Sequence, residues 1–358
     1  MKYLLAALLL LSPIAASANT VLFAGDELSS FSTVGTVTSI TISGMFRSNF
    51  TRGAIYPLQA SGDPPTTRAI ATFNSAVSTV WIQFHMCLVN SSCGLGTSTY
   101  TLLRVMDSAG NATIIIKGTG TNAEVNIDSR TSGGVFTTLV SCTSAWHGGT
   151  GGDMMTLEVV YASSGGSVTL YDDGTQVCTF SGNVTNGDGA TTLTSAEFDN
   201  LSGNSIGISE VLVTDFDARG YGVFDLYDNV NGASTSWAGT NVCTSIWNAL
   251  SYNDTTYAQA TSSGLVHNCG VYHTLPALYE PYAVVMSTRA LAGASAPTTF
   301  DFDTSIAGTD YLSSAYTPGT SFGSICCYVQ TTNPATGLAW TTSDITSGTF
   351  YLGLKSQP

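Results

Sequence analysis

The sequence has little charge, and basic residues are its scarcest class. Charged residues make up 9% of the 358 residues, against about 25% in ordinary globular domains. Lys and Arg number 10 against 24 Asp and Glu, which gives a formal net charge of −14. After Lys2, the lysines are Lys117 and Lys355 alone. Without a basic patch the chain cannot neutralise phosphates, which excludes nucleic-acid binding and an electrostatic anchor on a membrane surface.

Several motifs that carry chemistry are also missing. The sequence has no C-x-x-C pair, which argues against a zinc site. A G-x-S-x-G match, "GNSIG" at 203–207, precedes a strand pattern where a nucleophile elbow needs a helix. No stretch shows a helical apolar stripe longer than two turns. Thr, Ser, Gly and Asn supply the polar surface instead, which is typical of all-β extracellular proteins.

The first residues, "MKYLLAALLLLSPIAASA", have the features of an export signal. Lys2 precedes a short apolar core, Pro13 follows it, and Ala16 to Ala18 fit the small-residue cleavage rule. We therefore expect residues 1–18 to be a signal peptide, with an uncleaved apolar anchor as the alternative. No second apolar run follows, so no membrane span is expected after this segment.

Eight cysteines follow that segment, and an even number in an exported chain predicts disulfides. Pairing of sequence neighbours gives Cys87–Cys93, Cys142–Cys178, Cys243–Cys269 and Cys326–Cys327. The last pair is open, because adjacent side chains on a strand point to opposite faces. Alternatively, each of these two cysteines bonds to another cysteine, or one of them is a buried free thiol.

Apolar residues alternate with polar ones along most of the chain, which predicts strands. The clearest strands are "TLEVVY" (156–161) and "SVTLY" (167–171), and the turn Asp173-Gly174 predicts a hairpin to the next strand. Further strands are expected at 205–216, 283–291, 323–331 and 348–355, with one short helical turn within 332–345. A domain boundary is expected near "DFDARGYG" (215–222).

The order of five stretches resembles that of a concanavalin A-like, laminin-G-like sandwich. These are "STVWIQFHM", "TLLRVMDSAGNATIIIK", "AWHGGTGGDMMTLEVVY", "GSVTLYDDGTQVCTFSG" and "ISEVLVTDFDARG". The last of them, with "NGASTSWAG" and "TNPATGLAWTTSDI", is similar to virion-associated structural proteins of tailed phages. The resemblance covers most of residues 70–358. It implies an all-β protein: a laminin-G-like sandwich over 19–220 and a smaller jelly-roll-like domain over 221–358.

The export signal and the cysteines depart from this family, because phage structural proteins assemble in the cytoplasm. The resemblance also implies where chemistry should lie. Glycanases on such a sandwich carry an E-x-D-x-x-E-like acid motif, which is missing here. Glu158 and Glu210 lie on separate predicted strands, so no catalytic pair is expected.

Loop aromatics and loop acids are the remaining candidates. Aromatic rings are the usual platform for sugars, and the candidates for ligand binding are Trp237, Trp247, Tyr252 and Tyr257. Laminin-G-like sandwiches often bind calcium at their rim, and the candidates are Asp215 and Asp217, after a predicted strand. The histidines of "HNCGVYH", His267 and His273, flank Cys269, but this spacing is not a standard zinc pattern.

These observations predict a non-enzymatic surface or virion-associated protein that attaches to a glycan or cell-surface receptor. No cofactor is expected apart from a possible structural calcium. A glycan-cleaving enzyme on the same scaffold and a purely structural shell or filament subunit are the alternatives. Low surface charge and exposed strand edges favour self-association or assembly with virion proteins. The expected location is extracellular, on a surface or in a virion.

Overall fold

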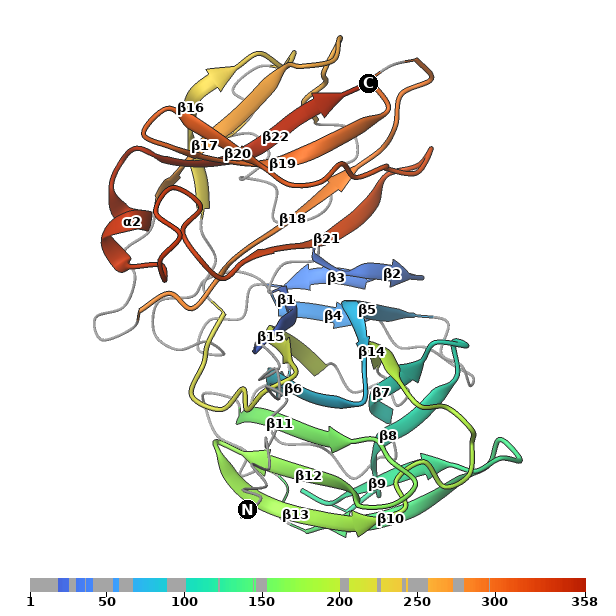
Figure 1. Ribbon diagram of the computed structural model, residues 1–358. Coiled ribbons are helices and arrows are strands. Elements are labelled where there is room, and N and C mark those ends of the chain that lie inside the picture. Colours follow the sequence, from blue (N-terminus) through green and yellow to red (C-terminus); the bar gives the residue numbers. More distant parts are fainter. Residues whose placement is uncertain are drawn as a thin grey trace, which may run out of the picture.

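The described part of the chain is all-β, with antiparallel strands as its main elements, as the sequence predicts (Figure 1). A computed structural model describes residues 19–25, 30–35, 37–40, 54–57, 67–88, 101–121, 123–143, 145, 153–199, 206–223, 227–239, 243, 257–272, 280–295 and 297–358. The predicted export signal, residues 1–18, lies outside this part of the chain. Within it, no helix is long and apolar enough to cross a bilayer.

The first half of the chain builds two packed sheets. The eight-stranded sheet has the order β13 (Thr175–Gly182), β12 (Gly166–Asp172), β11 (Asp153–Val160), β6 (Thr79–Leu88), β15 (Ile206–Thr214), β4 (Ala54–Pro57) and β3 (Val37–Ile40), with β1 (Val21–Gly25) on β15. The seven-stranded sheet has the order β10 (Phe136–Cys142), β9 (Val125–Arg130), β8 (Ala112–Gly118), β7 (Thr101–Asp107), β14 (Leu193–Asp199), β5 (Arg68–Val77) and β2 (Ser32–Val34). All their pairings are antiparallel, so each sheet can bury one face.

Alternation along each strand places the core between the sheets. On β6, Val80, Ile82 and Phe84 are buried and belong to the core. Phe198 of β14 meets Phe84 edge to face, with ring centroids 5.3 Å apart. Burial of such side chains stabilises the sandwich by about 1.5–3 kcal/mol each.

The predicted hairpin at residues 170–180 is confirmed. β12 pairs with β13 around Asp173 and Gly174, whose φ angles are +47° and +78°. Positive φ at both central residues is the type I′ turn, whose twist matches that of the flanking strands. Asp-Gly suits it because glycine takes positive φ without steric cost.

The second half builds a five-stranded sheet and a two-stranded ribbon. The sheet has the order β16 (Tyr227–Thr235), β17 (Val266–Tyr272), β22 (Phe350–Gln357), β19 (Thr299–Ile306) and β20 (Thr309–Leu312). The ribbon pairs β18 (Val284–Ala290) with β21 (Gly323–Gln330). The short helix α2 (Thr342–Thr346) precedes β22 and is capped by Thr341, close to the helical turn expected within 332–345.

The β18–β21 ribbon packs on both halves of the chain (Figure 1). Val284 and Met286 belong to the second core, between the ribbon and the five-stranded sheet. Val285, from the opposite face, packs against the first sandwich, as does Cys327. Strands β1–β15 pair only among themselves, and so do β16–β22, within the described residues. The ribbon therefore joins the halves through side-chain packing.

Three disulfides join the described cysteines. Cys142 at the end of β10 bonds to Cys178 on β13, and so links the edge strands of the two sheets of the first sandwich. Cys269 on β17 bonds to Cys243. Cys326 and Cys327 bond to each other. The alternatives that the sequence left open, separate partners or a buried free thiol, do not apply to this pair. Cys93, and with it the predicted Cys87–Cys93 pair, lies outside the described residues.

Candidate functional site

The segment that leaves β15 crosses the outer face of the eight-stranded sheet. Gln83 of β6 donates from Nε2 to the carbonyl oxygen of Tyr221 at 2.8 Å. The backbone nitrogen of Thr20 donates to Oδ1 of Asp215 at 2.7 Å. Strand alternation alone would leave Trp81 and Gln83 facing water, yet they are only 8% and 1% exposed. Residues 215–223, which we call the connector, are therefore part of the sheet's cover.

Arg219 fixes the connector onto the sheet. Its guanidinium lies 4.2 Å from the ring centroid of Tyr171 on β12 and 5.4 Å from that of Trp81. Asp217 accepts from the same group, with Nη2–Oδ2 at 2.6 Å and Nε–Oδ1 at 2.9 Å. Hydrogen bonds from Arg219 hold the pKa of Asp217 below its ordinary value, in spite of partial burial. The contact combines a cation–π interaction with a charge-assisted fork.

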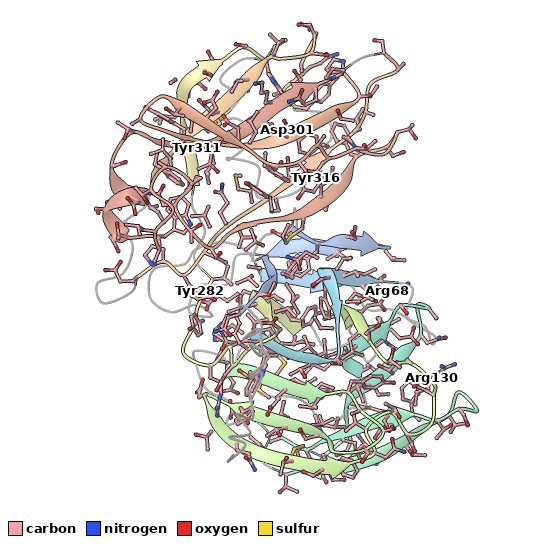
Figure 2. The ribbon with its side chains drawn as sticks, in the orientation of Figure 1. Arg68, Arg130, Tyr282, Asp301, Tyr311 and Tyr316 are labelled. Carbon is pink, nitrogen blue, oxygen red and sulfur yellow. A yellow bond between two sulfur atoms is a disulfide. The ribbon has the colours of Figure 1, made fainter. Side chains whose placement is uncertain are left out.

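Three aromatic rings meet where the two halves join, and we call them the junction cluster: Phe216, Tyr221 and Tyr282. The ring centroids of Phe216 and Tyr221 are 5.5 Å apart, and Tyr282 lies 5.3 Å from Phe216 and 5.4 Å from Tyr221. Phe216 and Tyr221 come from the connector, whereas Tyr282 precedes β18 (Figure 2). The Tyr282 hydroxyl donates to the carbonyl oxygen of Asn19 at 3.1 Å.

The junction cluster is partly open to solvent. Tyr221 is 37% exposed, and Phe216 and Tyr282 are half-buried. Burial, then Tyr221 and Asp215, raise the pKa of the Tyr282 hydroxyl, so the ring stays neutral at ordinary pH. Asp217 and Arg219 lie on the same connector and keep part of their side chains exposed, 46% and 34%. The site thus offers apolar ring faces beside a carboxylate and a guanidinium, an arrangement suited to an uncharged polyhydroxylated ring.

The eight-stranded sheet also carries buried polar groups on β6 and β15. His85 on β6 and Glu210 on β15 are 5% and 2% exposed. Glu210 has a φ of +51°, in a β-bulge where the register between β15 and β6 shifts. A non-glycine residue in the left-handed region is strained, and such strain gathers at functional sites. Sequence reasoning missed this feature, because an alternating pattern does not reveal a bulge.

The two glutamates do not form a retaining catalytic pair. Glu158 accepts from the Tyr171 hydroxyl at 3.2 Å. It lies on β11, and Glu210 lies on β15, with β6 between them. Glu158 pairs with Trp81, and Trp81 pairs with Thr214, which lies four residues after Glu210. The two glutamates are therefore further apart than two strand spacings of about 9.5 Å, whereas retention needs carboxyl groups about 5–5.5 Å apart. Glu158 and Glu210 thus lie on separate strands, as the sequence predicts.

Two of the four loop aromatics singled out in the sequence can be placed. Trp237 is half-buried and donates from Nε1 to the carbonyl oxygen of Leu265 at 3.0 Å, which ties its ring to the sheet of the second half. Tyr257 is 54% exposed, and its ring centroid lies 5.8 Å from that of Phe322. Trp247 and Tyr252 lie outside the described residues. The sequence missed the junction cluster because its rings come from segments about 60 residues apart.

The acids expected to bind calcium already have protein partners. Asp215 accepts from Thr20, and Asp217 is engaged by Arg219. A different set converges at the β11–β12 edge, where one carboxylate oxygen each of Asp153, Asp172 and Asp173 lies within 4.8 Å of the others. Calcium takes six to eight oxygens, so this set would supply part of a coordination shell. A structural calcium stays a prediction.

No protein-family model matches the sequence, and neither does any curated protein. Solved structures resemble it weakly. The endo-β-1,4-glucuronan lyase from the fungus Trichoderma reesei has a TM-score of 0.42 at 14% identity, over 56% of this chain and 98% of that one. The binding domain of botulinum neurotoxin DC in complex with SialylT has 0.37 at 12%, over 96% and 95%. Carbohydrate-binding module CBM66 from Bacillus subtilis has 0.28 at 12%, over 46% and 97%. Likenesses this low carry no argument about function.

Proposed function

We propose that this chain is a non-enzymatic attachment protein that binds glycans at the junction cluster. The observation that carries the proposal is the partly exposed set of Phe216, Tyr221 and Tyr282 beside the Arg219–Asp217 pair. A sugar ring has an apolar C–H face and a rim of hydroxyls. The aromatic rings suit the face, and the carboxylate and guanidinium suit the hydroxyls.

A shallow site of this size binds weakly by itself. Several copies on a cell surface, a filament or a virion would raise the overall affinity through effective concentration. Export and display on a surface fit the disulfides of the chain, since such bonds persist in oxidising surroundings. The similarity to phage virion proteins makes display on a virion one version of this proposal.

The test is a glycan array with the full chain, followed by calorimetric titration of the best ligand. The Tyr221→Leu variant keeps apolar bulk but removes the stacking ring. We expect affinity to fall about two- to tenfold, since an aromatic contact is worth about 0.5–1.5 kcal/mol. Tyr311→Leu, on β20, is the matched control and should bind as the wild type does (Figure 2). The Tyr257→Ala variant tests whether the glycan binds at this exposed loop aromatic instead of at the junction cluster.

Two results would overturn the proposal. If no glycan binds above background, a purely structural subunit becomes the better explanation. If Tyr257→Ala abolishes binding while Tyr221→Leu leaves it intact, the sugar site lies on the second half of the chain.

A glycan-cleaving enzyme is the second candidate, and the strained Glu210 favours it. Glu210 follows Ser209, which pairs with His85 on the neighbouring strand β6. The two side chains could act as acid and base if both reached one bound sugar. Turnover of any polysaccharide by the wild type, lost in the Glu210→Gln variant, would establish this function. Binding without turnover would reject it.

A further inference from the structure

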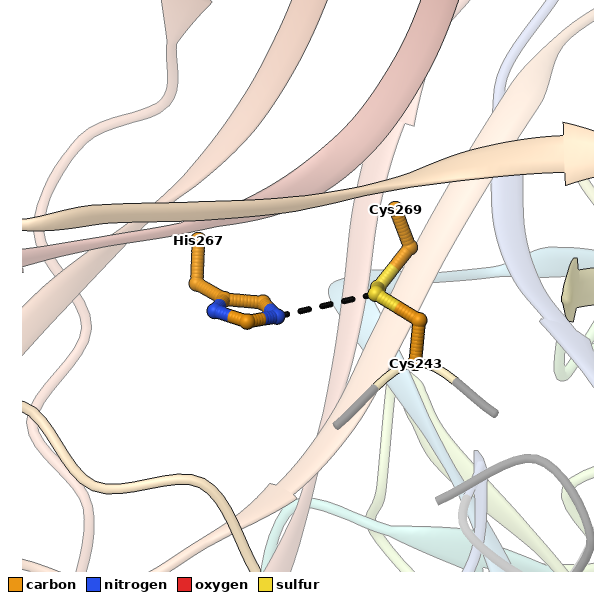
Figure 3. A group of neighbouring side chains, drawn as sticks. All are labelled: Cys243, His267 and Cys269. Atoms are coloured by element: carbon orange, nitrogen blue, oxygen red, sulfur yellow. Dashed lines mark hydrogen bonds between the residues drawn. A yellow bond between two sulfur atoms is a disulfide. The ribbon is translucent and has the colours of Figure 1, made fainter. Parts of the chain in front are cut away.

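A second cluster lies on the inner side of the five-stranded sheet. His267 and Cys269 are two residues apart on β17, so both side chains leave the strand on the same face. Cys243 meets them from a separate segment (Figure 3). All three are buried, at 7% exposure or less. Their neighbours across the sheet, Leu352 and Leu354 on β22, pack against the second core.

One distance in this cluster matches an edge of a tetrahedral metal site, although its two sulfur atoms are joined in a disulfide. Nε2 of His267 lies 3.5 Å from Sγ of Cys243. Zinc binds sulfur at about 2.3 Å and nitrogen at about 2.0–2.1 Å, so the N···S edge of its tetrahedron is about 3.5 Å. One ligand atom from each of the three residues lies within 4.8 Å of the others. Two thiolates and an imidazole form a donor set that zinc prefers.

The ring of His267 is oriented with one nitrogen toward the sulfur atoms. Its Nε2 points at them, as Figure 3 shows. Next to the disulfide, whose sulfur atoms have no proton to donate, this nitrogen can only donate its own N–H. Its Nδ1 is buried and has no hydrogen-bond partner among the described residues. Zinc binding would therefore need the imidazole proton to move to Nδ1, which leaves Nε2 free to bind the metal.

We propose that, before Cys243 and Cys269 are oxidised, these two thiols and His267 bind one zinc ion. Binding releases the two thiol protons, because the metal takes thiolates. Oxidation by a disulfide such as oxidised glutathione then joins the two sulfur atoms, reduces the oxidant to two thiols and releases the zinc. The sulfur atoms must separate to about 3.8 Å in the metal form, so disulfide and zinc exclude each other. The inference does not depend on glycan binding.

The direct test uses the full chain reduced by a trialkylphosphine without oxygen, with Zn²⁺ alone as the probe. We expect one Zn²⁺ per chain, and cobalt in its place should give thiolate charge-transfer absorption. The Cys243→Ser/Cys269→Ser variant should lose this binding, and His267→Ala should weaken it at least tenfold. Cys142→Ser/Cys178→Ser removes another disulfide and should still bind one ion. Equal binding in concentrated urea, or by the Cys243→Ser/Cys269→Ser variant, would overturn the proposal.

A second measurement needs no variant. The reduced wild type is reoxidised with oxidised glutathione, with and without Zn²⁺, and its disulfides are followed by peptide mapping. Zinc should slow the formation of the Cys243–Cys269 disulfide at least tenfold. It should leave the rate of formation of the Cys142–Cys178 disulfide unchanged. If zinc changes the rate of neither bond, this result would contradict a zinc site at His267.

Discussion

At the scale of single residues, Arg219 carries the contact between the connector and the sheet. It stacks on Tyr171 and holds Asp217 at the same time. We expect Arg219→Ala to lower the free energy of unfolding by about 1 kcal/mol, the value of a partly exposed cation–π contact. Thermal unfolding checks this as a fall of about 2–4 °C. Arg130→Ala, on the seven-stranded sheet, is the control, and an equal fall there would remove the special role of Arg219.

Asp303 makes stability depend on pH. It lies on β19 and is fully buried, and a hydrogen bond from the Asn268 side chain offsets only part of the effect of burial on its carboxylate. Burial, and next the carboxylate of Asp310, raise its pKa to about 6 from 3.8. The folded state therefore holds this proton where the unfolded state has lost it, and stability falls as pH rises from about 4 to about 6.

The Asp303→Asn variant removes this titration. We expect it to be more stable than the wild type at pH 7, by at most about 3 kcal/mol, and to match it near pH 3.5. Urea unfolding at pH values from 3.5 to 7 measures the difference. A constant difference across this range would show that Asp303 does not titrate as described.

At the scale of elements, the disulfides differ in the length of chain that they close. Cys142–Cys178 closes 36 residues and ties β10 to β13, whereas Cys326 and Cys327 are adjacent. Loop-closure entropy predicts a loss of about 4 kcal/mol for Cys142→Ser/Cys178→Ser and about 1 kcal/mol for Cys326→Ser/Cys327→Ser. Denaturant unfolding without reductant gives both values. Equal losses would mean that packing, not loop closure, sets the effect.

Local patterns predicted the strands but not their distant partners. The runs at 156–161, 283–291 and 348–355 fall on β11, β18 and β22, within a few residues at each end. Alternation encodes which face of a strand is apolar. It does not encode that β6 pairs with β11 and β15, which lie more than 60 residues further along the chain.

The candidate sites were hidden for the same reason. The junction cluster needs Tyr282 beside Phe216, and the second cluster needs Cys243 beside His267. The H-x-C spacing on β17 matched no zinc pattern because the remaining ligand lies 24 residues earlier. Neighbour pairing of cysteines succeeded where both partners were close in sequence, as in Cys243–Cys269.

At the scale of the whole molecule, Val285 connects the two halves. It faces the first sandwich from the ribbon, close to Tyr282. We expect Val285→Asp to loosen this contact, increase the radius of gyration in solution scattering, and weaken glycan binding about as much as Tyr221→Leu does. Leu338→Asp is the control, because Leu338 is 69% exposed. An unchanged radius with lost binding would place the effect in the site alone.

The ribbon has a further consequence, because neither of its faces is left to water. Two domains on a flexible tether swing independently, but these two halves have a shared layer between them. An attachment protein under fluid flow must transmit tension from its binding site to the point where it is itself anchored. Here the force would pass through packed side chains. The two halves would bear the load as one rigid body, without the extension that a flexible linker allows.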